Sequence, residues 1–301
     1  MRKTSLLLLI TLFTSCSFNK IFLKPTPISR QARKARTIDL DTHDTTYVRF
    51  SGNNFQPEFV NRNNEITEKE YILESVLFKN SNGTELNGWF LTPKSGTPEI
   101  TILHLHGNEG NLLTQYKAVA PLVKNGFQIF LFDYSGFGFS EGKATQQNIL
   151  VDALSAVDFV KSRLETKQTK LVIYGQSAGG HLASVVAEKK KSLIDGLIIE
   201  GAFSSPKDIA AYTLKKKIGL GFIGRVLTKS DYDALTSIKI FQKPVLIIHS
   251  KEDKEVPFYM SQKLYNNANN PKQFYPITGP HIYGPKLFTD SISLKIKALI
   301  K

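Results

Sequence analysis

The chain has 301 residues, a hydrophobic content of 41% and a formal net charge of +13. This length and composition fit one domain of about 250 residues with a single large core, and they exclude a disordered, collagen-like or repeat protein. The basic charge is compatible with a nucleic-acid or membrane partner, but the chain has no zinc-finger, RRM or KH signature, so we expect no nucleic-acid binding.

The first fifteen residues have the pattern of a secretory signal. Two basic residues are followed by a mostly apolar stretch over 5–13 and by small residues at 14 and 15. The apolar stretch is shorter than the roughly 20 residues that a membrane-spanning helix needs. The single cysteine, Cys16, comes next, so no intramolecular disulfide can form. Residues 12–16 resemble the cleavage box of bacterial lipoproteins, which predicts lipid attachment at Cys16. The alternative is an ordinary signal peptide with an incidental cysteine.

We therefore expect an exported bacterial protein, anchored to a membrane through Cys16 and facing the periplasm or the cell surface. Residues 16–70 are interpreted as a linker and a loose N-terminal extension with one strand near 47–50. Six basic residues lie between Cys16 and the first acidic residue, Asp39. Either these charges strengthen attraction to an anionic leaflet, or they only follow the excess of positive charge in the whole chain.

Beyond residue 70, strand patterns alternate with helical patterns. The expected strands are a hairpin over 72–78 and 86–91, followed by 100–105, 127–132, 171–174, 197–199 and 245–248. The expected helices are 112–124, 146–164, 178–190, 259–265 and 287–300. Several of the strands are continuous apolar runs, which is typical of a parallel sheet covered on both faces. We therefore predict an α/β domain over 71–301, with a mostly parallel central sheet, an antiparallel N-terminal edge, helices on both faces and a small lid insertion at 206–243.

A candidate nucleophile lies where a strand runs directly into a helix. Residues 175–179 read Gly-Gln-Ser-Ala-Gly, with an apolar strand before them and a helical pattern after them. This context is typical of a nucleophile elbow, a sharp turn that lifts the serine hydroxyl clear of the sheet. A second Gly-x-Ser-x-Gly motif over 138–142 lacks it, because no helical pattern follows directly. The sequence therefore predicts Ser177, and not Ser140, as the nucleophile.

The loop after the strand at 100–105 is a candidate oxyanion loop. It contains two glycines, which allow the backbone to approach a substrate oxygen. We predict that the backbone N–H groups of Asn108 and Ala178 form the oxyanion hole. A zinc site at His104 and His106 is the alternative, but zinc sites need three or four ligands and no further histidine lies nearby.

A candidate acid and base follow in chain order. Asp253 lies in a loop after the strand at 245–248, and His281 lies in a loop rich in glycine and proline. In folds with such an elbow, the catalytic residues follow one another along the chain in the order serine, acid, histidine, which is the order found here. The imidazole would take the serine proton while the carboxylate fixes its tautomer. Glu200, Asp231 and Asp233 are alternative acids.

Together these segments resemble the α/β-hydrolase superfamily. They are His-Gly-Asn at 106–108, Asp-Tyr-Ser-Gly-Phe-Gly at 133–138, Gly-Gln-Ser-Ala-Gly-Gly at 175–180, and Asp253 with Val-Pro at 256–257. The resemblance is closest to the small-lid branch, which includes proteins like monoglyceride lipases and serine aminopeptidases. It implies a serine acyl-enzyme mechanism without a metal or other cofactor. Ser250 stands where glycine is usual, Pro280 where glycine is common and Ser135 where arginine is frequent, and these departures bear on the substrate more than on catalysis.

The sequence predicts a carboxylesterase- or lipase-like serine hydrolase acting on a small-molecule or lipid-like acyl substrate. An ester or thioester carbonyl would be attacked by the serine and released by water. Four aromatic residues either line an acyl pocket or pack beneath the loops: Tyr134, Phe137, Phe139 and Phe203. A serine peptidase on the same fold and a non-catalytic lipoprotein that binds a ligand are the alternative functions.

Overall fold

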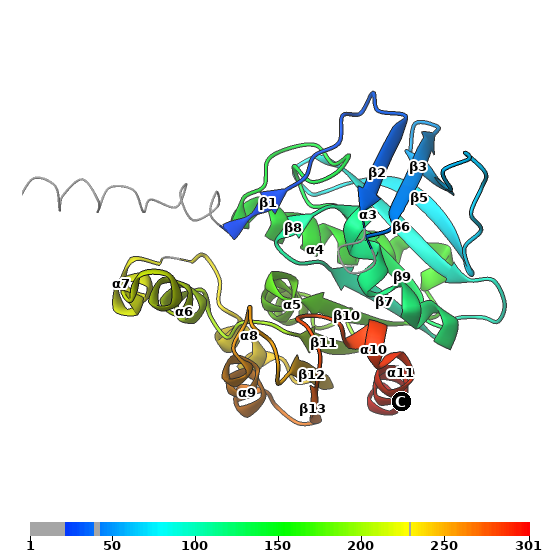
Figure 1. Cartoon of the computed structure of the whole chain (residues 1–301). Coiled ribbons are helices and arrows are strands. Elements are labelled where there is room, and N and C mark those ends of the chain that lie inside the picture. The colour runs from blue at the N-terminus through cyan, green and yellow to red at the C-terminus, as the bar shows by residue number, and fades with distance from the viewer. Residues whose placement is uncertain (1–21, 39–42, 229) are drawn as a thin grey trace, which may run out of the picture.

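A central sheet of eight strands organises the computed structural model, which describes residues 22–38, 43–228 and 230–301 (Figure 1). In spatial order the strands are β13 (Lys272–Ile277), β12 (Val245–Ser250), β11 (Gly196–Glu200), β10 (Lys170–Gln176), β7 (Ile100–Leu105), β9 (Gln128–Phe132), β6 (Glu85–Pro93) and β5 (Tyr71–Lys79). The six strands from β13 to β9 are parallel, whereas β6 and β5 pair antiparallel. The predicted mostly parallel sheet with an antiparallel N-terminal edge is confirmed.

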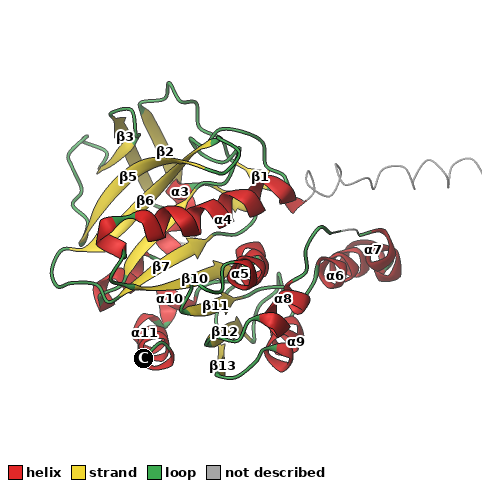
Figure 2. Ribbon diagram, turned by 180° about the vertical axis from the view of Figure 1, so that it is seen from behind, coloured by secondary structure: helices red, strands yellow, loops and turns green. Residues whose placement is uncertain are grey.

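Helices cover both faces of this sheet (Figure 2). One face packs against α4 (Gln146–Ser162), α5 (Ala178–Lys189), α8 (Ala234–Ile240) and α9 (Phe258–Asn267). The other face packs against α3 (Leu112–Gln115), the 3-10 turns η1 (Tyr116–Ala118) and η2 (Ala120–Asn125), α10 (Gly284–Leu287) and α11 (Thr289–Leu299). Every residue of β7, β9 and β12 is buried, because strands covered on both faces have no solvent side.

The helix expected over 112–124 is broken into three short pieces. The proline at position 121 lies in the first turn of η2, where its missing N–H costs nothing, but inside a continuous helix it would remove a hydrogen bond. A further 3-10 turn, η3 (Leu164–Thr166), follows α4.

The N-terminal region is more ordered than the loose extension expected from its polar composition. Three strands, β2 (Lys34–Ile38), β3 (Thr45–Ser51) and β4 (Gln56–Val60), form an antiparallel sheet. The Phe59 ring contacts the Trp89 and Tyr116 rings at centroid distances of 6.3 and 5.4 Å, so this small sheet joins the core on the α11 face.

Two shorter segments complete the fold near the ends of the parallel strands. The strand β1 (Lys24–Pro25) pairs with β8 (Glu109–Gly110) in the predicted oxyanion loop. The insertion after β11 contains α6 (Pro206–Ile218) and α7 (Gly221–Leu227), in addition to α8. No helix in the part of the chain that the structure describes has the length and apolar content needed to cross a bilayer.

Replacing Phe59 with alanine is expected to destabilise the fold. The side chain is 4% exposed and packs between two aromatic rings, so its removal leaves a cavity that costs about 3 kcal/mol. Urea denaturation should show this loss, whereas Ile66→Ala, at a side chain that is 63% exposed, should change the free energy of unfolding by much less. An equally small effect for Phe59→Ala would show that the N-terminal sheet does not contribute to the core.

Candidate active site

Ser177 occupies a strained turn between β10 and α5. Its φ of 55° lies in the left-handed region, which residues other than glycine rarely adopt. Two glycines make room for this turn, because a Cβ at Gly175 would collide with the carbonyl of Gly179, and a Cβ at Gly179 with that of Leu105. The result is a half-buried serine at the N-terminus of α5, at the carboxyl edge of the sheet.

Ser140 has a different environment. Its hydroxyl donates to the carbonyl of Asp133 at 2.6 Å and accepts from the backbone N–H of Asn87 at 2.9 Å. It therefore fastens the loop after β9 to β6. Of the two serines in Gly-x-Ser-x-Gly motifs, Ser177 is the one placed at a strand-to-helix turn.

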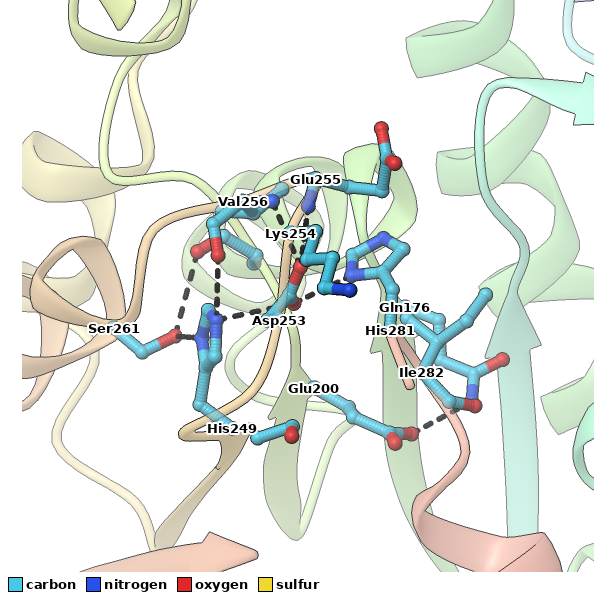
Figure 3. Close-up of polar contacts among 12 residues, drawn as sticks. Gln176, Glu200, His249, Asp253, Lys254, Glu255, Val256, Ser261, His281 and Ile282 are labelled. Atoms are coloured by element: carbon cyan, nitrogen blue, oxygen red, sulfur yellow. Dashed lines mark hydrogen bonds and ion pairs between the residues drawn. The ribbon is translucent and has the colours of Figure 1, made fainter. Parts of the chain in front are cut away.

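The structure brings Asp253 and His281 together (Figure 3). The Nδ1 atom of His281 lies 2.6 Å from Oδ2 of Asp253. The other carboxylate oxygen accepts the backbone N–H groups of Glu255 and Val256 at 2.8 and 2.9 Å. Because a carboxylate accepts from Nδ1, the proton of a neutral imidazole lies on Nδ1, and Nε2 is left as an acceptor.

The carboxyl group of Asp253 is shielded from solvent, with only 1% of the side chain exposed. Burial alone would raise the pKa of Asp253, but hydrogen bonds from His249 and His281 outweigh it. The pKa is held well below its ordinary value, so the carboxylate stays ionised beside the imidazole.

His281 and Ser177 lie at the same edge of the sheet. The backbone N–H of Ser177 donates to the carbonyl of Glu200, and a Cβ added to the next residue, Gly201, would lie 3.0 Å from Cε1 of His281. Within the described residues, no hydrogen bond joins the Ser177 hydroxyl to the imidazole. Such contacts commonly tighten only when substrate binds.

Glu200, an alternative acid, supports the histidine loop instead of the imidazole. Its buried carboxylate accepts from the Tyr174 hydroxyl at 2.8 Å, from Nε2 of Gln176 at 2.6 Å and from the N–H of Gly284 at 2.6 Å. Burial raises the pKa of Glu200 in spite of these donors. The same Gln176 amide also donates to the carbonyl of Ile282, a β-branched residue held at a φ of 55°. This network fixes the strained backbone next to His281.

The other alternative acids lie elsewhere. Asp233 caps α8 by accepting the N–H groups of Leu235 and Thr236, and Asp231 is exposed in the lid insertion.

Sequence reasoning missed His249, which supports the acid. Its Nε2 lies 2.9 Å from the carbonyl of Val256 and 3.2 Å from the Asp253 carboxylate, while Nδ1 lies 2.5 Å from the Ser261 hydroxyl. The ring is fully buried and holds the acid loop against α9. The sequence contained one indication of this role: His249 lies at the end of an apolar strand and four residues before Asp253.

Two more residues tie the acid loop to the histidine loop. The Ser250 hydroxyl donates to the carbonyl of Gly279, and the Glu252 carboxylate accepts the N–H of the same glycine at 2.8 Å. Ser250, noted above as a departure from the family pattern, therefore has a positioning contact that glycine could not make.

The predicted oxyanion donors lie beside Ser177. A Cβ at Gly107 would be 3.8 Å from Cβ of Ser177, so the loop that contains Asn108 packs directly against the elbow. Within the described residues, the backbone N–H groups of Asn108 and Ala178 have no acceptor. Two free N–H groups near a serine suit an anionic oxygen, and that of Ala178 also benefits from the dipole of α5.

A segment of the N-terminal linker, residues 22–28, holds this loop in place and was not anticipated. The N–H of Lys24 donates to the carbonyl of Asn108 at 2.8 Å, and Nδ2 of Asn108 donates to the carbonyl of Phe22 at 2.6 Å. The N–H groups of Thr26 and Ile28 donate to Gly110 and Gly138, respectively. Prolines, which have no N–H to donate, occupy positions 25 and 27, between the three donors.

A cavity of about 620 Å³ opens between this segment, the oxyanion loop and the loop after His281. Its lining includes Thr26, Glu109, Gly110, Ile282 and Tyr283. This volume is within the usual range for a small-molecule site.

Of the four aromatic residues considered for an acyl pocket, only Phe203 is in the hydrophobic cluster that includes Ala178. Tyr134, Phe137 and Phe139 pack in the two cores on either side of the sheet.

His104 and His106, considered above as zinc ligands, are both buried. Burial lowers their pKa values to about 3 and about 4, so both rings are neutral. No group of three or more histidine, cysteine, aspartate or glutamate residues that could hold a metal occurs among the residues described. Cys16, the predicted lipid-attachment residue, lies outside the described residues.

Comparisons with known proteins agree with the fold. A family model described as the alpha/beta hydrolase fold matches residues 100–217. YfhR of Escherichia coli is 35% identical over 215 residues, which cover 69% of this chain and 73% of YfhR. The alpha/beta hydrolase domain-containing protein WAV2 of Arabidopsis thaliana is 29% identical over 206 residues, covering 65% of this chain and 67% of WAV2. The esterase Pf2001 of Pyrococcus furiosus superposes with a TM-score of 0.64 at 18% identity, over 77% of this chain and 92% of Pf2001, a likeness of fold.

The depressed pKa of Asp253 predicts a pH-dependent contribution to stability. A carboxyl group whose folded pKa is below its unfolded value stabilises the fold fully above the unfolded value, and this contribution declines as the pH falls toward the folded pKa. The advantage of the wild type over Asp253→Asn in urea denaturation should therefore be smaller at about pH 3 than at about pH 5. An advantage that is unchanged or larger at the lower pH would contradict the assigned pKa direction.

Proposed function

The chain belongs to the α/β-hydrolase superfamily, and on that premise we propose that it is a serine hydrolase that cleaves carboxylic esters through an acyl-enzyme on Ser177. The observation that carries this proposal is the combination of an elbow serine with an imidazole bonded to an ionised carboxylate at the same edge of the sheet.

In the proposed mechanism, the Ser177 hydroxyl attacks the ester carbonyl while Nε2 of His281 accepts its proton. Asp253 keeps the other ring proton on Nδ1 and stabilises the imidazolium that forms. The N–H groups of Asn108 and Ala178 donate to the carbonyl oxygen as it becomes negative. The imidazolium then protonates the leaving alkoxide, and a water molecule activated by His281 releases the acid and regenerates the serine.

Two observations favour an ester over a peptide substrate. The cavity between the oxyanion loop and the loop after His281 is of small-molecule size. A protein of similar fold, Pf2001, is named an esterase. Thioesters and lipid esters present the same carbonyl to the same residues.

Replacing Ser177 with alanine is expected to abolish hydrolysis of a p-nitrophenyl ester, with a loss of about 10⁴-fold or more, because the acyl-enzyme cannot form. Labelling of the purified protein by a fluorophosphonate probe should be lost in parallel. Ser140→Ala is the matched control from the second motif and should still be labelled. A wild type that neither reacts with the probe nor cleaves any ester would favour a binding protein, whereas labelling together with cleavage of aminoacyl amides alone would favour a peptidase.

We also propose that the protein is an exported lipoprotein anchored through Cys16. The support is the charged start, the short apolar stretch and the position of the only cysteine. Cells expressing the wild type with a labelled fatty acid should incorporate the label into the protein, and Cys16→Ser should remove it. Equal incorporation in both would refute lipidation at this residue.

A further inference from the structure

Large apolar side chains are exposed on the lid insertion. Four of the twelve large hydrophobic residues recorded as exposed in the described chain lie within seven consecutive positions: Leu220, Phe222, Ile223 and Val226. Phe222 is 79% exposed and Val226 is 60% exposed. We call these four residues the lid patch. A cluster of this kind commonly marks an interaction site.

The helix α7 presents its apolar residues outward. Its two glycines face α6, because a Cβ at Gly221 would lie 2.8 Å from the carbonyl of Ala211, and a Cβ at Gly224 would lie 2.6 Å from that of Ala210. Small residues thus allow α7 to pack closely on α6, while Phe222 and Val226 point to solvent. A surface helix of a soluble protein normally has the opposite arrangement, with its large apolar side chains buried.

The surroundings of the lid patch are basic. Residues 209–230 contain five lysines or arginines and no acidic residue. Lys215 and Lys216 are exposed close to the patch, and Arg225, also exposed, pairs with the carboxylate of Asp208 at 2.7 Å. Apolar side chains flanked by cations match the boundary between the headgroups and acyl chains of an anionic bilayer. The same excess of positive charge disfavours pairing between two copies of this surface.

The position of the patch agrees with a nearby membrane. Tyr212 of α6 packs in the same cluster as Ala178, the residue after the nucleophile, and Phe22, where the described chain begins. The rings of Phe22 and Phe203 are 5.4 Å apart. Figure 1 shows β1 and the α6–α7 pair on the same side of the molecule. The proposed anchor at Cys16 is only six residues before Phe22.

We propose that the lid patch binds the surface of an anionic phospholipid bilayer, with Phe222, Ile223 and Val226 inserted between the headgroups. This contact is separate from the lipid anchor and does not depend on the proposed hydrolase activity. It places α6, whose Tyr212 packs in the cluster that includes Ala178, close to the membrane.

Tryptophan fluorescence tests this proposal on the full chain and, because the contact is separate from the proposed anchor, on the same chain with Cys16→Ser. The single native tryptophan, Trp89, is buried and gives a constant background. Phe222→Trp is placed in vesicles of phosphatidylcholine and phosphatidylglycerol that carry bromine on the acyl chains. The added emission should move to shorter wavelength and fall by about twofold, because the ring lies within reach of the bromine atoms. Pure phosphatidylcholine or high salt should weaken the quenching.

Leu164→Trp is the matched control, because Leu164 is also 79% exposed. It lies before the start of β10, about 20 Å from the edge where Ser177 lies, and its added emission should not be quenched. Val226→Trp repeats the test on the same face of α7.

Absence of quenching for both lid variants in anionic vesicles would overturn the proposal. So would a blue shift without vesicles that grows with protein concentration, since this would show that a second copy covers the patch.

Discussion

The ionised carboxylate of Asp253 is the interaction on which the candidate site depends. A carboxyl group so shielded from solvent would ordinarily become neutral, and a neutral acid would not hold the imidazole in a single tautomer. Four donors prevent this: two backbone N–H groups of its own loop, His281 and His249. The two backbone donors belong to the same turn as Asp253, residues 253–256. The carboxylate is therefore positioned before any substrate is present.

Holding this arrangement requires backbone strain at two places. Ser177 and Ile282 both have a φ of 55°, and a non-glycine residue in this region costs about 1–3 kcal/mol. Both are stabilised by the same buried residue: the Glu200 carbonyl accepts the N–H of Ser177, while its side chain binds Gln176 and the N–H of Gly284. Glu200 thus links the turn at Ser177 to the loop that contains His281. This link explains why a carboxylate is buried here although it takes no part in the proposed chemistry.

The parts of the site that sequence could predict are those determined locally. The sheet, the elbow and the order of Ser177, Asp253 and His281 follow from apolar runs and from motifs only a few residues long. Of the sheet of β2, β3 and β4, only the strand near 47–50 was predicted, as β3. The other two strands were missed because the sheet is stabilised by contacts distant in sequence, such as Phe59 with Trp89, and its composition is polar. The segment 22–28 was missed for the same reason, since its hydrogen bonds reach residues more than 80 positions away.

The segment 22–28 also connects the chemistry to the location of the protein. Its backbone holds Asn108, and six residues before its first residue lies the proposed anchor, so the connecting chain spans at most about 20 Å. A lipid on Cys16 would therefore keep the oxyanion loop close to the bilayer regardless of how the rest of the molecule turned. With the lid patch as a second contact, rotation about the anchor would be restricted. This placement close to the bilayer would favour a substrate dissolved in it, such as a lipid-like ester, over a soluble one.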